Sequence, residues 1–204
     1  VQITKNDWRN RNQLKGIEGL FWLTVPVRTK DQFGQTIREV EIINSGWSRK
    51  HWRAIEVNYQ KAPYFSQYAK DLKELYERNY KYLVEVNRSF FDFICRCLQI
   101  EVKTISSTEL NYQGGSPSER VANICELVGA DTYLSGPSAR DYSNVEYFAK
   151  WAIHVEYMSY DNYPEYKQLF SGFVHNVSVL DLVLNLGSRA RDFMKFPQMR
   201  RSGL

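Results

Sequence analysis

The pattern of apolar and polar positions divides the chain into a β-rich start, a helical middle and an α/β second half. In the first stretch, residues 2–27 alternate around a turn at Lys15-Gly16, and residues 20–25 are rich in strand-forming side chains. Residues 37–43 alternate as well. The pattern therefore predicts a β-hairpin in which 37–43 is the second strand.

The middle of the chain has three segments with apolar residues at helical spacing. Ser48 is a candidate N-cap for a helix that runs toward Asn58. Pro63 suits the first turn of a second helix, which covers Tyr64–Tyr76. A longer pattern over Tyr82–Leu98 predicts a third helix with one apolar face.

In the second half, short apolar runs alternate with amphipathic segments. Strands are predicted over 100–105, 132–134 and 153–158, with helices over 118–128 and 145–151 and a last helix over 178–186. This order implies parallel strands with right-handed crossovers. The predicted fold class is α/β: an N-terminal β-hairpin and a helical middle, followed by a parallel, doubly wound (Rossmann-like), three-layer half. We expect one α/β domain over 1–187 and a basic tail over 188–204.

Composition narrows the class of protein. The chain has 204 residues, which favours one domain, and its 25% of charged residues argues against disorder. Three cysteines without Cys-x-x-Cys spacing predict reduced thiols in a cytoplasmic protein. No apolar run approaches the roughly 20 residues that cross a bilayer, so no membrane span is expected.

The charge is concentrated at one end of the chain. Residues 187–204 hold five basic side chains and one acid, whereas the rest of the chain has equal numbers of each. Because nucleic-acid binding needs a basic field spread over a face, no nucleic-acid partner is expected. No His, Cys and Asp residues have ligand spacing, so no metal is predicted either.

Several short strings occur in an order typical of one known family. They are Trp8-Arg9-Asn10-Arg11-Asn12, Trp22-Leu23-Thr24-Val25-Pro26-Val27, Lys50-His51-Trp52, Tyr59-Gln60-Lys61-Ala62-Pro63-Tyr64-Phe65, Gly129-Ala130, Tyr133-Leu134-Ser135-Gly136-Pro137 and Ser178-Val179-Leu180-Asp181-Leu182, with Asn185 and Gly187. Together they span nearly the whole chain, and in them the sequence resembles the WbqC-like protein family.

The resemblance implies a role in the assembly of O-antigen or other bacterial surface polysaccharides. Members of the family usually begin with a strand and an aromatic Gln-Pro-Tyr-Phe-like segment, which is absent before the Trp8 string. The resemblance therefore implies either that the chain has been trimmed or that a strand and part of the site are missing.

The first candidate site lies in the string Arg9-Asn10-Arg11-Asn12. In an extended strand Arg9 and Arg11 share one face, while Asn10 and Asn12 share the other. Paired guanidinium groups suit a diphosphate or a carboxylate, since each donates two parallel hydrogen bonds. The alternative is an exposed edge strand that its charges keep soluble.

The most reactive candidate is the pair Lys50-His51 near a helix start. His51 suits a general base at neutral pH, and Lys50 adds charge for an anion at a helix N-terminus. The alternative is a surface histidine beside solvated lysines. Lys61 and Tyr64 join the predicted site through their matching string, and Tyr64 could also stack on a sugar or belong to the core.

Two further groups complete the predicted substrate- and phosphate-binding residues. Ser135 and Gly136 follow a strand, with Arg140 close behind, and ligands of α/β sheets bind at the carboxyl ends of strands. A plain tight turn is the alternative. Asp181 and Asn185 lie four apart on one face of an apolar helix, which indicates either a structural network or a ligand contact.

Two functions fit these residues and the resemblance. The first is an enzyme that transfers an acyl or aminoacyl group to a nucleotide-linked amino sugar, with His51 as its base and with ATP or a nucleotide sugar as the bound nucleotide. The alternative is a non-catalytic binding or assembly partner in the same pathway. The sequence has no phosphate loop of the G-x-x-x-x-G-K type and no G-x-S-x-G motif, so it supports neither a P-loop enzyme nor a serine hydrolase.

Overall fold

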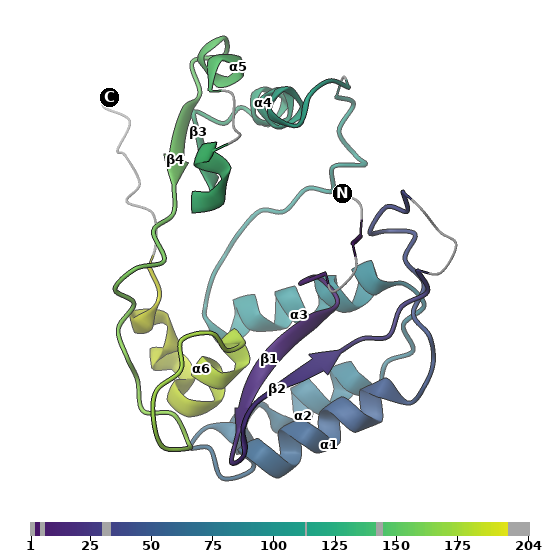
Figure 1. Cartoon of the computed structure of the whole chain (residues 1–204), viewed down its shortest axis with the longest axis vertical. Coiled ribbons are helices and arrows are strands. Elements are labelled where there is room, and N and C mark those ends of the chain that lie inside the picture. Colours follow the sequence, from purple (N-terminus) through teal and green to yellow (C-terminus); the bar gives the residue numbers. More distant parts are fainter. Residues whose placement is uncertain (1–2, 5–6, 30–33, 113, 142–144, 196–204) are drawn as a thin grey trace. The chain divides into compact units, whose positions relative to one another are not determined.

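A computed structural model describes residues 3–4, 7–29, 34–112, 114–141 and 145–195 (Figure 1). The chain forms two compact units. Unit 1 consists of Val1–Glu101 and Pro164–Met194, and unit 2 consists of Val102–Tyr163 and Lys195–Leu204. The single domain expected over 1–187 stays a prediction, and each unit is treated below by itself. Across the described ranges, no helix combines the length and apolarity needed to cross a membrane.

Unit 1 contains the N-terminal antiparallel hairpin that the alternation indicated, but with a different second strand. β1 (Arg11–Gly16) pairs with β2 (Gly19–Thr24), from Arg11 opposite Thr24 to Gly16 opposite Gly19. A two-residue turn closes this hairpin, and local closure costs less chain entropy than closure over a long loop. The prediction that 37–43 forms the second strand was therefore wrong. That segment makes only isolated bridges, such as the one between Val27 and Ile42.

The three helices of the middle are confirmed. They are α1 (Trp47–Tyr59), α2 (Phe65–Glu77) and α3 (Leu83–Cys97). The predicted cap Ser48 lies inside α1, because Gly46 occupies the N-cap position with a left-handed φ of 70°. Figure 1 shows the hairpin lying beside these helices, and β1 contacts α1.

The last helix of unit 1, α6 (Val179–Leu186), is buried along most of its length. The Ser178 side chain caps it by accepting a hydrogen bond from the Leu180 N–H at 3.3 Å. The helix contacts β1, α2 and α3 and is followed by the 3-10 helix η2 (Gly187–Phe193). Fully buried Val183 and Leu184 therefore join the core that α1–α3 form around Ile55.

Unit 2 is a small α/β arrangement. It contains α4 (Pro117–Leu127), β3 (Thr132–Ser135), η1 (Pro137–Asp141), α5 (Glu146–Ala149) and β4 (His154–Tyr157). β3 and β4 pair in parallel, as their alternation with helices predicted. Its core is centred on Phe148, whose ring stacks on that of Tyr133 with centroids 5.2 Å apart.

The strand predicted over 100–105 was wrong. This segment has no regular structure, and its apolar residues Val102 and Ile105 are exposed. An apolar run becomes a strand only where another strand pairs with it, and within the described ranges none does. The observed parallel sheet has two strands. A larger doubly wound, three-layer half stays a prediction.

Candidate functional site

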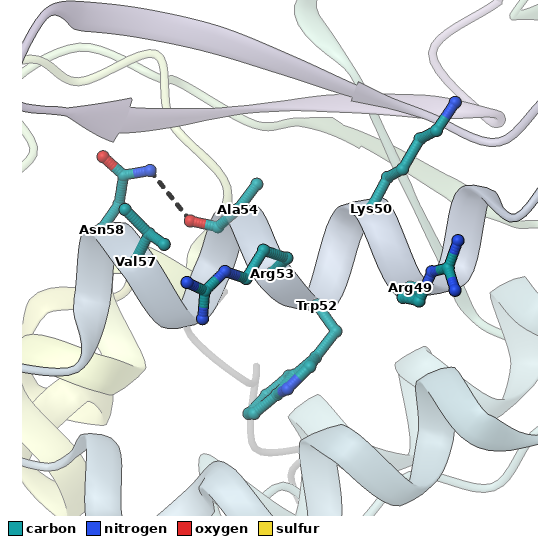
Figure 2. A pocket seen from close by; sticks show the side chains of 7 residues that line it. All are labelled: Arg49, Lys50, Trp52, Arg53, Ala54, Val57 and Asn58. Carbon is teal, nitrogen blue, oxygen red and sulfur yellow. Dashed lines mark hydrogen bonds between the residues drawn. The ribbon is translucent and has the colours of Figure 1, made fainter.

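The outer surface of α1 carries a hollow that we call the α1 hollow. Its lining residues are Arg49, Lys50, Trp52, Arg53, Ala54, Val57 and Asn58, and its volume is about 610 Å³ (Figure 2). The helical pattern explains its position, because the buried face of α1 contains Trp47, Ile55 and Tyr59. The opposite arc is therefore left to the cationic side chains. In Figure 2, Lys50 and Ala54 extend from the helix on the side of the hairpin.

The α1 hollow has positive charge that is not fully neutralised. The Arg53 guanidinium forms an exposed ion pair with the Glu56 carboxylate at 2.8 Å. Arg49 and Lys50 are exposed, and within the described part of the chain neither has an ion-pair partner. Because exposed ion pairs are weak, the pair with Glu56 does not tie up Arg53, and all three cations are available to an anionic ligand. Their positions 49, 50 and 53 follow helical spacing, which could have been recognised in the sequence.

An aromatic ring completes this hollow. Trp52 is half-buried, and one face of its indole stacks on the Phe65 ring with centroids 6.0 Å apart and planes 22° apart. This contact fixes the orientation of the indole, because stacked rings gain energy beyond their buried area. A fixed indole next to cations can stack against a planar base or the apolar face of a sugar.

His51 lies on the opposite, buried face of α1 and not at the surface. Its Nε2 is 3.0 Å from the carbonyl oxygen of Thr24. Because a carbonyl only accepts, Nε2 must carry the proton, and Nδ1 is then the basic atom. The rings of Trp47 and Tyr76 contact the imidazole edge-on, at 5.1 and 5.9 Å between centroids.

Burial lowers the pKa of His51 to about 4, although its hydrogen bond to Thr24 acts in the opposite direction. The imidazole is therefore neutral at neutral pH. The expectation of a surface histidine is wrong, and its role as a base stays a prediction. The sequence contained the signal for burial: Trp47 and Ile55 lie four residues before and after it.

The Arg9-Asn10-Arg11-Asn12 string divides between a turn and β1. Arg9 precedes the strand, so it does not share an extended face with Arg11 as expected. Its guanidinium binds the buried Asp7 carboxylate at 2.9 and 3.1 Å. The Arg11 guanidinium lies over the Trp22 ring, 3.9 Å from the centroid.

The two asparagines of this string have local partners. The Asn10 side-chain amide donates to the Val25 carbonyl at 3.0 Å, and the exposed Asn12 side chain accepts from the Gln13 N–H at 2.8 Å. Arg11, whose guanidinium lies over an indole, is therefore the residue of this string best placed to offer donors to an anion. Binding of a ligand by these residues stays a prediction.

Asp181 is the centre of a buried polar network. Its two carboxylate oxygens accept hydrogen bonds from the hydroxyls of Tyr59 and Tyr166, each at 2.6 Å. The Asn185 side chain donates to the Asp181 backbone carbonyl at 2.8 Å. Burial, followed by the effect of the Asp181 carboxylate, raises the pKa of both tyrosines, so both remain donors. This geometry matches the structural alternative for Asp181.

The network continues to a buried lysine, Lys15, which lies in β1 and not in the turn that the sequence indicated for it. Lys15 is 5% exposed, and its Nζ donates to Gln168 Oε1 at 3.0 Å and to the carbonyls of Phe170 and Ser171 at 3.1 and 3.0 Å. The backbone carbonyl of Gly172 is the fourth oxygen in contact with Nζ. Lys15 therefore holds segment 168–172 on β1. The two ends of this contact are 153 residues apart, which no local pattern reveals.

The predicted residues Lys61 and Tyr64 follow α1. Lys61 is exposed. The Tyr64 ring packs against Gly187, where a Cβ atom would lie 2.3 Å from Tyr64 Cδ1. The Tyr64 backbone N–H also donates to the Leu184 carbonyl at 3.0 Å. Tyr64 thus seals the end of α6, and Gly187 is needed for this close approach.

In unit 2, Ser135 and Gly136 lie at the carboxyl end of β3, with Arg140 in η1. The Ser135 Oγ donates to the Tyr133 hydroxyl at 3.3 Å, and the Arg140 guanidinium lies 5.1 Å from the centre of the Tyr157 ring at the end of β4. The structure therefore brings the three predicted residues to one end of the parallel pair, where α/β sheets bind ligands.

No metal centre emerges from the described residues, in which no group of three or more His, Cys, Asp and Glu side chains could hold an ion.

Comparison with known proteins agrees with the resemblance seen in the sequence. A profile of the WbqC-like protein family matches residues 1–193. The chain is 42% identical over 197 residues to "Uncharacterized protein Rv1507c" of Mycobacterium tuberculosis, which covers 96% of this chain and 85% of that protein. No solved structure matches the chain significantly. The match over nearly the whole length shows that the chain belongs to the WbqC-like protein family.

Proposed function

We propose that this protein binds a nucleotide-linked amino sugar in the α1 hollow and transfers an acyl or aminoacyl group to it. The observation that carries the proposal is the meeting of Arg49 and Lys50 with the stacked Trp52 in one hollow. The proposed setting, which the resemblance to the WbqC-like family supports, is cytoplasmic synthesis of bacterial surface polysaccharides such as O-antigen.

The chemistry of such a ligand fits the residues of the hollow. A nucleotide sugar has a negatively charged diphosphate, a planar base and an apolar sugar face. The cations of the hollow attract the diphosphate, and the fixed indole of Trp52 can stack on either the base or the sugar. A volume of about 610 Å³ lies in the range of small-molecule sites, which is about 300–1,000 Å³.

Two other predicted residues keep proposed anion-binding roles. Arg11 on the hairpin lies over the Trp22 ring, which orients its N–H groups toward an anion. Arg140 lies over the Tyr157 ring and is proposed as an anion ligand of unit 2 by itself. His51 is the proposed base through Nδ1. Burial on the face of α1 opposite the hollow lowers its pKa to about 4, so this role requires a rearrangement that exposes Nδ1 to the ligand during the reaction. In an adenylate-forming variant of the proposal, ATP activates the acyl group.

A thermal-shift panel tests the proposal. The chain is heated with ATP, CTP and UDP-, dTDP- or GDP-linked amino sugars. A ligand at a hundredfold excess over its Kd adds about 2.7 kcal/mol of stability, which gives a visible shift in Tm. We expect a shift with one nucleotide sugar that is lost in Arg49→Ala and Lys50→Ala. The matched control is Lys70→Ala, which removes an exposed cation of α2 outside the hollow. An equal loss in Lys70→Ala would contradict the assignment.

A non-catalytic binding or assembly partner is the second candidate, and exposed apolar side chains favour it. Trp8 is 75% exposed, Ile17 at the hairpin turn 79% and Trp22 on β2 48%. Exposed groups of large apolar residues often mark protein-binding surfaces. If this candidate is correct, Trp22→Ser prevents co-purification with enzymes of the pathway, whereas Arg49→Ala does not.

A further inference from the structure

A second hollow adjoins the α1 hollow at the start of α1 and the end of α2, and we call it the α1–α2 hollow. It has a volume of about 460 Å³ and shares Arg49 and Trp52 with its neighbour. Its charged lining residues are Arg49, Lys73, Arg78 and Glu77. Three cations and one acid leave the lining positively charged.

The charge balance leaves two guanidinium groups for a ligand. Lys73 and Glu77 lie four apart on α2, and their side chains pair at 3.6 Å. Arg49 and Arg78 have no ion-pair partner in the ranges that the structure describes. Two arginines on one hollow can each donate parallel hydrogen bonds to phosphate oxygens.

A buried hydroxyl in the wall of the α1–α2 hollow points to the same chemistry. Tyr80 lines the hollow, and its hydroxyl oxygen is shielded from solvent without a hydrogen-bond partner among the described residues. A buried polar group without a partner costs about 1–3 kcal/mol. Because this oxygen is closed to solvent, a ligand oxygen can accept its hydrogen bond and remove this cost only when the side chains that cover it move aside.

The start of α1 adds uncompensated donors. Its N-cap is Gly46, which offers no side-chain acceptor, and its first turn contains no acidic residue. The first backbone bond of the helix is donated by the Lys50 N–H to the Gly46 carbonyl. The N–H groups of Trp47, Ser48 and Arg49 therefore precede the helical ladder at the positive end of a 13-residue helix. All three residues line the hollow.

We infer that the α1–α2 hollow is a binding site for a phosphate-class dianion, held by Arg49, Arg78 and the start of α1. Its identification with the diphosphate of a nucleotide-linked sugar rests on the proposed function. Because Arg49 and Trp52 belong to both hollows, the diphosphate would lie in the α1–α2 hollow and the base or sugar against Trp52 in the α1 hollow.

Ser48 offers a variant that separates binding from folding. Ser48→Asp places a carboxylate in the first turn of α1. The carboxylate stabilises the helix through its interaction with the helix dipole, but its negative charge repels an anionic ligand from the site. Ser48→Asn has nearly the same size without the charge, and it is the matched control. Arg78→Ala removes one proposed ligand group directly.

Calorimetric titration with inorganic pyrophosphate tests the inference. We expect the wild type and Ser48→Asn to bind, and Ser48→Asp and Arg78→Ala to bind at least about tenfold more weakly, while the Tm of Ser48→Asp is equal or higher. Equal affinity of Ser48→Asp and Ser48→Asn, or no binding by the wild type, would overturn the inference.

Nucleotide sugars distinguish this inference from the proposed function. If pyrophosphate binds as expected but no nucleotide-linked sugar does, the anion site stands and the proposed function fails. A different result would be that a nucleotide sugar binds, that Lys50→Ala weakens its binding, and that Ser48→Asp binds it with the same affinity as the wild type. The proposed function would then stand, and the α1–α2 hollow would not hold the diphosphate.

Discussion

Replacing His51 with glutamine should remove a pH-dependent part of the free energy of unfolding. The side chain of His51 is 8% exposed, and burial lowers its pKa to about 4, compared with 6.5 for a free histidine. Glutamine keeps an N–H donor for the Thr24 carbonyl but does not titrate. The variant therefore preserves the hydrogen bond to Thr24 and removes only the proton equilibrium.

The magnitude follows from the two pKa values. At about pH 8, well above both pKa values, the imidazole is neutral in the folded and unfolded states, so it makes no pH-dependent contribution. As the pH falls toward 4, the unfolded chain takes up a proton that the folded chain excludes, and stability is lost. At about 1.4 kcal/mol for each pKa unit, the loss reaches about 2 kcal/mol by about pH 5 and about 3 kcal/mol below about pH 4.

Urea unfolding of the wild type and His51→Gln between about pH 8 and about pH 5 measures this difference. The wild type should lose about 2 kcal/mol more than the variant over this range. His175→Gln is the matched control, because His175 is exposed, and it should follow the wild type. If His51→Gln lost as much stability as the wild type, the buried, neutral imidazole would be refuted.

Two substitutions and one labelling experiment test the core of unit 1. Asp181→Asn should destabilise the protein by about 2–4 kcal/mol, because two buried tyrosine hydroxyls lose a charged acceptor; denaturant unfolding measures it. Gly187→Ala should cost about 2 kcal/mol or more, since the new Cβ meets the Tyr64 ring and φ is 60°; thermal unfolding reveals it, and a Tm equal to wild type would contradict this packing. The buried thiol of Cys97, whose pKa burial raises to about 11, should alkylate more slowly than the half-buried Cys95 in the folded protein; mass spectrometry of peptides after timed iodoacetamide treatment compares them.

Local patterns predicted the helices of the chain well. The apolar spacing in 64–76 and 82–98 matches α2 and α3 closely, because each helix buries one face on the same core. The parallel pairing of β3 and β4 also followed from the alternation of strands and helices. The helices depend on neighbours within one or two turns and the strand pairing depends on the order of elements, and each of these can be read directly from the sequence.

Features that depend on long-range partners could not be predicted in this way. Strand alternation in 37–43 does not specify which strand it pairs with, and the hairpin that the structure shows is the local one, closed by the short turn between β1 and β2. The buried position of Lys15 depends on carbonyls more than 150 residues away. Within the site, the Lys50-His51 motif indicated Lys50, whereas Arg49 and Arg53 belong to no motif and share with it only the exposed arc of α1.

Photo-crosslinking tests the location of the proposed ligand site most directly. A nucleotide-linked amino sugar with an azido group on its base is irradiated with the chain, and labelled peptides are mapped by mass spectrometry. We predict labelling within α1 that excess unlabelled nucleotide sugar suppresses and that Arg49→Ala abolishes. Labelling of 132–141 in unit 2, without labelling of α1, would contradict a binding site on α1.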